Sequence, residues 1–179
     1  MLAATTTAPL PVPIEQAKAY LRLGGSEEDA LLAGLMRSAT EMCEGFTRLV
    51  LIAREVEETL PARPVWTRLG AAPVQAVLGV SALTAGAEPA PLASGDYMVD
   101  IDASGDGWVR VLRSGAAGRV LVRYSAGLGT DWNAVPEPLR QGIVRMAAHL
   151  YTYRDREDGR GPPAAVTALW LPYRRLRLC

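Results

Sequence analysis

Near the N-terminus, apolar residues recur at the spacing of an α-helix. Pro13 suits a first helical position and Gly24-Gly25 a helix end, which predicts a short helix over 13–23. A second, amphipathic helix is predicted over 26–47, with Ser26 as its N-cap and an acidic first turn. Its apolar stripe follows three- and four-residue steps: Leu32, Leu35, Ala39, Met42 and Phe46.

The same spacing returns after Pro136. It predicts a helix over 136–153 and, beyond a charged run, a short helix over 163–171 that Pro172 stops. Apolar stripes of this kind bury themselves against one another, so we expect the 26–47 and 136–153 helices to pack together. The residues expected in that packing are Leu32, Leu35, Ala39 and Met42 with Leu139, Ile143, Met146 and Leu150.

Between the helical stretches the pattern changes to that of β-strands. From 49 to 125, short β-type runs alternate with Gly, Pro and Asp. Antiparallel pairing is predicted through ASGDG (103–107) and SGAAG (114–118), because both are Gly-containing connections of hairpin length. The segment 86–95 is predicted to be an exposed loop.

These patterns predict an α+β fold. Helices from the two ends of the chain would form one small bundle, with an antiparallel β-rich region inserted between them. We expect a single domain over 13–171, a flexible N-terminal arm over 1–12 and an extended docking tail over 172–179.

Composition narrows the class of protein. Of 179 residues, 49% are hydrophobic, which is enough for a real core. Nineteen basic and 19 acidic residues balance, so no global field draws the chain onto DNA or an anionic membrane. No run reaches the ~20 apolar residues that span a bilayer, and residues 1–12 do not resemble a signal peptide, so we expect use in the cytosol or in an assembly built there.

Candidate catalytic and metal-binding residues are few. Cys43 and Cys179 cannot build a disulfide framework or a zinc site, and Cys43 is expected to be buried. His149, the sole histidine, is expected to be partly buried or to lie at an interface, and not to be a general base. Asp100, Asp102 and Asp106 suggest a calcium loop, but its twelfth position is Val111, so acidic hairpin-turn residues are the better interpretation. We therefore expect no catalytic, cofactor-binding or metal-binding residues and no enzyme activity.

The C-terminal tail has a pattern that is typical of a binding segment. If it is extended, Leu176 and Leu178 face one side and Arg175 and Arg177 the other. The tail could be an edge strand of its own sheet, or its arginines could contact DNA phosphates. We favour docking on another protein, because no chain remains to cover the leucines and arginine grips carboxylates in a bidentate manner.

Three stretches resemble one known family. Residues 11–48 carry Leu21-Arg22-Leu23, an acidic linker and Asp29-Ala30-Leu31-Leu32, which is similar to the opening of head-tail connector (adaptor) proteins of long-tailed bacteriophages and gene transfer agents. VPEPLRQGIVRMAAHLYTYRD (135–155) and AVTALWLPYRRLRL (165–178) resemble that family's later helix and its closing segment.

The resemblance implies a non-enzymatic ring subunit, generally in twelve copies, between the portal of a DNA-filled capsid and a tail-side stopper or tail terminator protein. DNA would pass through the ring without sequence-specific binding, and no membrane would be involved. The protein would reside at the head-tail interface of the particle after assembly in the host cytoplasm. The implied portal-binding residues are Tyr173, Arg174, Arg175, Leu176, Arg177 and Leu178.

Two other classes of function remain open at this stage. A small enzyme or ligand-binding domain could use the β-rich region as a pocket. A DNA-associated factor could hold phosphates with its arginines, in which case its binding would fall steeply with salt.

Overall fold

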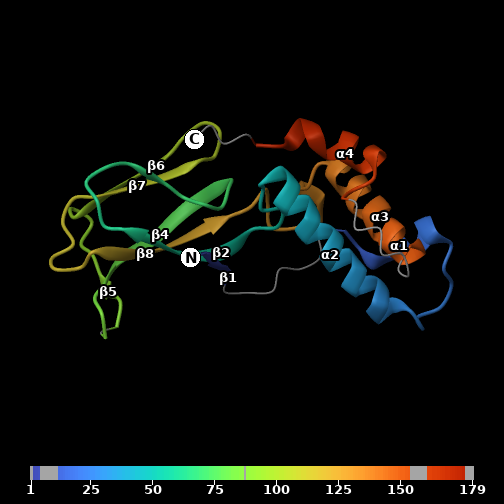
Figure 1. The fold of residues 1–179 in the computed structure, drawn as a ribbon, viewed down its shortest axis with the longest axis horizontal. Coiled ribbons are helices and arrows are strands. Elements are labelled where there is room, and N and C mark those ends of the chain that lie inside the picture. The colour runs from blue at the N-terminus through green and yellow to red at the C-terminus, as the bar shows by residue number, and fades with distance from the viewer. Residues whose placement is uncertain (1, 5–11, 87, 154–160, 176–179) are drawn as a thin grey trace. The chain divides into compact units, whose positions relative to one another are not determined.

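The chain folds as two compact units (Figure 1). The computed structural model describes residues 2–4, 12–86, 88–153 and 161–175. We call Met1–Ala8 with Ala53–Leu128 the β unit, and Pro9–Ile52 with Gly129–Cys179 the helical unit. The predicted α+β class, with a β-rich insertion between two helical stretches, is confirmed. The expectation of one domain over 13–171 differs from the structure, which separates that range into two units.

Among the described residues, four α-helices build the helical unit. Most of its helix ends lie within a few residues of the predicted ones, but α2 begins at Asp29 rather than just after Ser26. Ser26 is not its N-cap, because the Ser26 carbonyl instead accepts the Asp29 N–H at 3.2 Å in a preceding turn. The elements are α1 (Ile14–Leu21), α2 (Asp29–Thr47), η1 (Trp132–Ala134), α3 (Glu137–Thr152), α4 (Ala164–Trp170) and η2 (Leu171–Tyr173).

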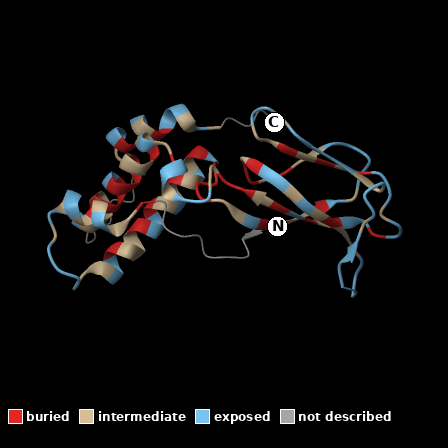
Figure 2. Cartoon of the chain, turned by 180° about the vertical axis from the view of Figure 1, so that it is seen from behind, coloured by how far each residue is buried: buried red, intermediate tan, exposed pale blue. Residues whose placement is uncertain are grey.

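Helix α3 is the centre of this unit and packs against α1, α2 and α4. The buried residues lie on the sides of the helices that face one another (Figure 2). On α2 the buried stripe runs through Met36 and Cys43, whereas Leu35 and Met42 of the predicted stripe are half-buried. Leu150 on α3 is half-buried as well. The other expected packing residues are buried: Leu32, Ala39, Leu139, Ile143 and Met146.

In the described part of the β unit, the strands form two antiparallel sheets. The larger has the order β1-β2-β8-β4-β5 and the smaller the order β3-β7-β6. The strands are β1 (Leu2–Ala4), β2 (Arg54–Pro61), β3 (Thr67–Arg68), β4 (Val74–Leu83), β5 (Ala90–Pro91), β6 (Tyr97–Ile101), β7 (Gly107–Val111) and β8 (Arg119–Ala126).

Strand β8 is central to the larger sheet, between β2 and β4. Its side chains alternate, with one face of Val120, Val122, Tyr124 and Ala126 completely buried. The Tyr124 hydroxyl accepts a hydrogen bond from the Ala71 N–H at 3.1 Å and donates one to Glu58 at 2.9 Å. The polar tip of a core side chain is thereby satisfied, as burial requires.

One of the two predicted hairpins is confirmed. ASGDG joins β6 to β7 as an antiparallel pair, whereas SGAAG does not make a hairpin, because β7 and β8 belong to different sheets. A Gly-rich connection of hairpin length therefore carries the chain from one sheet to the other. The predicted loop over 86–95 is largely exposed, but Ala90–Pro91 pairs with β4 as a short strand.

The predicted flexible arm needs correcting at both of its ends. Leu2–Ala4 forms β1, which pairs with β2 from Leu2↔Glu58 to Ala4↔Val56. A three-residue segment without a strong hydrophobic pattern is held by backbone hydrogen bonds to an existing sheet edge, which its own sequence does not reveal. Val12 is fully buried. Residues 5–11 lie outside the described residues.

Candidate functional site

The tail begins at a tightly packed aromatic residue. Trp170 ends α4 and is fully buried, the largest such side chain in the described residues. Its ring lies against Gly142 of α3, where an added Cβ would come within 2.1 Å of the Trp170 Nε1. Only glycine leaves room for the indole at this point, so a notch in α3 positions the start of the tail.

Phe46 of α2 connects this anchor to the tail arginines. Its ring centroid lies 5.9 Å from that of Trp170, in a tilted arrangement. The guanidinium carbon of Arg174 lies 5.4 Å from the Phe46 ring centroid, within range of a cation–π interaction. Phe46 therefore contacts both the last helix and the residue that follows η2.

Arg175 is fixed through its backbone. Its N–H donates a 2.9 Å hydrogen bond to the carbonyl of Thr47, the last residue of α2. Carbonyls at a helix C-terminus lack intrahelical partners and carry partial negative charge, so a cationic segment is well placed there. We call Phe46, Thr47, Gly142 and Trp170, with the tail residues Arg174 and Arg175 that they hold, the tail anchor.

The six predicted portal-binding residues therefore fall into two groups. Tyr173 lies in η2, and Arg174 and Arg175 contact α2 of their own helical unit. In the structure these three residues continue the fold and do not form a detached tail. Leu176, Arg177 and Leu178 lie outside the described residues, so the predicted alternation of leucine and arginine stays a prediction.

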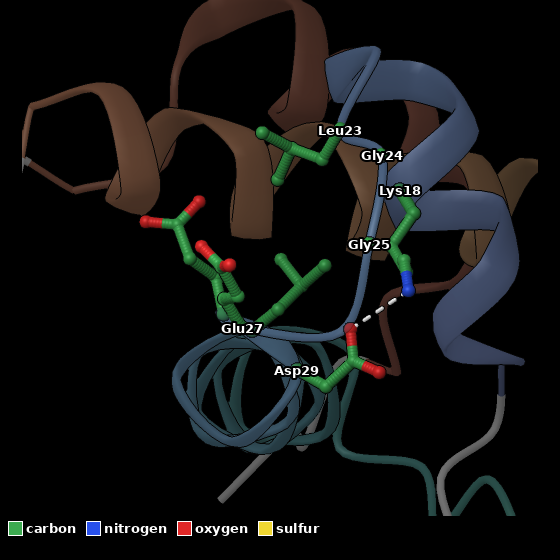
Figure 3. Close-up of a pocket in the computed structure, with 8 residues that line it drawn as sticks. Lys18, Leu23, Gly24, Gly25, Glu27 and Asp29 are labelled. Atoms are coloured by element: carbon green, nitrogen blue, oxygen red, sulfur yellow. Dashed lines mark ion pairs between the residues drawn. The ribbon is translucent and has the colours of Figure 1, made fainter.

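The motif at 21–32 forms the elbow between α1 and α2 (Figure 3). Arg22 adopts the left-handed conformation (φ 57°) and ends α1, and the Leu23 N–H donates to the Lys18 carbonyl at 3.0 Å. A pocket of about 90 Å³ opens here. Its lining residues are Lys18, Leu23, Gly24, Gly25, Glu27, Glu28, Asp29 and Leu32.

Polar contacts tie this elbow together. The Lys18 ammonium lies 2.8 Å from the Asp29 carboxylate, and the hydrogen bond between them raises the pKa of Lys18 above its ordinary value. Glu28 accepts a 2.6 Å hydrogen bond from the Tyr151 hydroxyl on α3. The motif thus joins three helices, which is a structural role and not a chemical one.

The two other candidate reactive residues, His149 and Cys43, also have structural roles. His149 is half-buried on α3, with its ring centroid 4.7 Å from that of Tyr153. Cys43 is buried as predicted, and burial raises the pKa of its thiol, which makes the thiol less reactive.

The acidic calcium-loop candidate forms the β6–β7 turn. Asp102 accepts hydrogen bonds from the backbone N–H of Ser104 (2.8 Å) and Asp106 (3.0 Å) and from the indole of Trp108 (3.2 Å). Asp106 pairs with Arg68 at 2.7 Å. In the described part of the chain, no three His, Cys, Asp or Glu side chains gather where they could hold a metal ion. Within the described ranges, no helix has the length and apolar character needed to cross a bilayer.

The sequence reasoning missed the tail anchor. The sequence did not indicate a packing role for Gly142, because a glycine inside an amphipathic helix indicates only a lower helix propensity. One signal was available, since Trp170 and Pro172 close a short apolar helix just before the tail. A large aromatic residue at that point needs a complementary small residue on a neighbouring helix.

Comparison with known proteins adds an independent observation. No protein-family model matches the sequence, and no curated protein matches it. Solved structures do match. A chain of the "Neck of empty GTA particle computed with C6 symmetry" is 28% identical, with a TM-score of 0.83 over 100% of this chain and 97% of that chain.

Two further structures agree. A chain of the "Virion of native gene transfer agent (GTA) particle" is 29% identical with a TM-score of 0.80. One from the "Neck of native GTA particle computed with C12 symmetry" is 27% identical with a TM-score of 0.78. Both alignments cover 100% of this chain and 97% of the other. The chain therefore has, over its whole length, the α+β fold of a gene transfer agent neck protein.

Proposed function

We propose that this protein is a structural, non-enzymatic subunit of the neck of a gene transfer agent or tailed phage particle. The observation that carries the proposal is the full-length likeness to neck chains at 27–29% identity, with TM-scores from 0.78 to 0.83. The likeness extends through both units and through the tail anchor, so it does not depend on a single shared motif.

Within the neck, the proposed role is that of a head-tail adaptor. About twelve copies would form a ring between the portal and a tail-side stopper or tail terminator protein, after assembly in the host cytoplasm. Neck structures of the matching chains computed with C6 and C12 symmetry support a ring. A formal net charge of zero suits a conduit that DNA crosses without being held.

The tail anchor suggests how the tail would work. Tyr173, Arg174 and Arg175 continue the helical unit and would set the point from which the chain leaves it. Leu176, Arg177 and Leu178 would then supply the surface for the portal. Because an extended residue spans at most ~3.5 Å, the portal contact would lie within about 10–14 Å of Arg175.

The test removes residues 176–179 and leaves the tail anchor intact. We expect the truncated protein to keep its helical circular dichroism and unfolding midpoint and to lose binding to purified portal. Cys179→Ser in the full-length chain is the matched control and should bind normally. Electron microscopy of particles should place the full-length protein in the neck. Normal portal binding by the truncated protein would contradict the assignment of the tail, and density elsewhere in the particle would contradict the neck function.

A further inference from the structure

Within the described residues, the smaller sheet of the β unit has two edges, and they differ in chemistry. Its order, β3-β7-β6, puts β3 at one edge and β6 at the other. Edge strands offer unpaired backbone groups and half-covered side chains, and soluble proteins usually protect them with charge or cover. In the described residues, each edge of this sheet carries exposed apolar side chains together with a single charged residue that has no ion-pair partner.

The β6 edge is apolar and carries an acidic residue. Val99 and Val109 are cross-strand partners on the same face, but Val109 is 2% exposed and Val99 is 45% exposed. The layer that covers this face therefore ends between β7 and β6. Met98 (47%) and Ile101 (39%) are exposed beside Val99, and Asp100 is exposed between them. We call these four residues the β6 edge patch.

The β3 edge has complementary chemistry. Val65 (56% exposed) and Trp66 (42% exposed) directly precede β3. Arg63 is exposed beside them, while its carbonyl accepts a 3.2 Å hydrogen bond from the Val111 N–H. Within the described residues, neither Arg63 nor Asp100 has an ion-pair partner for its side chain. We call Arg63, Val65 and Trp66 the β3 edge patch.

We propose that the β6 edge patch of one copy docks on the β3 edge patch of a second copy, with Asp100 facing Arg63 of that copy. A closed ring of identical subunits requires a heterologous interface, in which two different patches of each copy meet. The two edges of this sheet are such a pair, since both are apolar and they carry opposite charges. Trp66 is the residue type that most often dominates interface energy, and opposite charges at the rim select the partner.

This inference rests on the proposed ring, and it names the contact between neighbours in that ring. It goes beyond the tail, because it involves only residues of the β unit. A portal contact through residues 176–178 is compatible with it, since the two sites use different parts of the chain.

Covalent trapping can test the contact without ambiguity. In one copy β7 separates β3 from β6, so the two edges are about 9–10 Å apart, whereas a disulfide requires Cα atoms within about 7 Å. A disulfide between Val65→Cys and Val99→Cys can therefore form only between copies. The background is Cys179→Ser, and the remaining Cys43 is fully buried.

The experiment is performed on assembled particles after mild oxidation. We expect a ladder of covalent multimers from the Val65→Cys/Val99→Cys protein. The matched control, Val65→Cys/Leu78→Cys, keeps one edge and moves the second thiol to an exposed residue of β4; we expect at least tenfold less multimer from it. If a ring is visible by electron microscopy but no ladder exceeds the control, this inference is wrong and the proposed function stands. If the protein is missing from the neck, both are wrong.

A charge exchange gives an independent result. Asp100→Arg or Arg63→Asp alone should lower the ladder yield several-fold in the trapping background, because like charges would then face each other. Combining the two reversals should restore it, which a general loss of folding would not permit. Reversal of Glu88, an exposed acidic residue outside both patches, is the control and should change nothing. Failure of the double exchange to restore the yield would overturn the pairing of Asp100 with Arg63.

Discussion

The two units of this protein place a tryptophan differently. The helical unit buries its large aromatic Trp170 completely, in a notch made by Gly142. The β unit buries the inner face of β8 just as fully, yet leaves Val65, Trp66 and Val99 exposed at the edges of its smaller sheet. Both units expose some large apolar side chains, among them Tyr20, Leu31 and Leu171 of the helical unit, but in the β unit most of them lie at the two edges of one sheet.

The exposed sheet edges and the tail are therefore the parts of the two units where we expect other subunits to bind. In the helical unit the proposed portal contact lies in the few residues beyond Arg175, next to the core around Trp170. In the β unit the proposed contact between copies is part of the sheet itself. Substitutions in the helical core should therefore change folding first, while substitutions at the sheet edges should change assembly and leave folding alone.

The largest effect is expected for Trp170→Ala. Removing a fully buried indole should lower the free energy of unfolding by about 3–5 kcal/mol, because the neighbouring helices cannot close the cavity completely. Chemical denaturation followed by helical circular dichroism reports this unit, since the described α-helices all lie in it. Leu171→Ala, at an adjacent and exposed residue, should cost less than about 0.5 kcal/mol. If both variants lost the same free energy of unfolding, Trp170 would not be buried in the helical core in solution.

The next largest change in the free energy of unfolding is expected for Gly142→Ala, and here the sign of the change tests the structure. Inside a helix, Gly→Ala normally stabilises a protein by about 0.5–1 kcal/mol. At Gly142 the new Cβ would come within 2.1 Å of the Trp170 Nε1, so we expect a loss of about 1–3 kcal/mol.

Gly45 is the matched control for this substitution. It lies in α2 with nothing within 4 Å of an added Cβ. Gly45→Ala should therefore stabilise the same unit in the same denaturation experiment. A stabilising Gly142→Ala would mean that the indole does not occupy the notch in solution.

A smaller effect is expected in the core of the β unit for Tyr124→Phe. The substitution removes the hydroxyl that accepts from the buried Ala71 N–H and donates to Glu58. An unsatisfied buried donor costs about 1–3 kcal/mol, so we expect a loss near the low end, because Glu58 keeps its 2.7 Å bond from the Gly70 N–H.

The control for this core substitution is Tyr97→Phe. The Tyr97 hydroxyl makes no hydrogen bond within the described residues, and its loss should be close to neutral. Near-ultraviolet circular dichroism and thermal unfolding measure both variants. The closed core of the β unit is supported only if the two substitutions differ.

The helices were predictable because their signal is local. Proline and glycine mark the ends of α1, and three- and four-residue steps mark α2 and α3. The stripe on α2 was placed about one residue off, since Leu35 and Met36 are both apolar and periodicity alone does not choose between them. The predicted start of α2 at Ser26 was wrong, because a good N-cap residue followed by acidic residues also fits a turn before the helix.

Other features could not be predicted because they depend on distant segments. Strand β1 is held by β2, more than 50 residues away in the chain. SGAAG looks like a hairpin turn, but the partners of β8 are β2 and β4. The tail anchor needs Gly142 and Trp170 together, and no local pattern links them. The docking tail stays a prediction, and the residues that hold its first part, Arg174 and Arg175, were not predicted.

The smallest effect is expected at the α1–α2 elbow, where the Lys18–Asp29 pair gives a pH-dependent contribution. The hydrogen bond to Asp29 raises the pKa of Lys18 above its ordinary 10.5, so the pair stabilises the folded state below pH 10.5 and loses this contribution as the pH rises above it. Lys18→Met should lower the unfolding midpoint slightly at pH 8 and by less at pH 12. Because tyrosines also titrate in alkali, Asp29→Asn and the double variant are needed to isolate the coupling between the two side chains. If the coupling free energy between Lys18 and Asp29 were as large at pH 12 as at pH 8, it would not arise from their charges. The elbow would then be held by packing, as the tail anchor is.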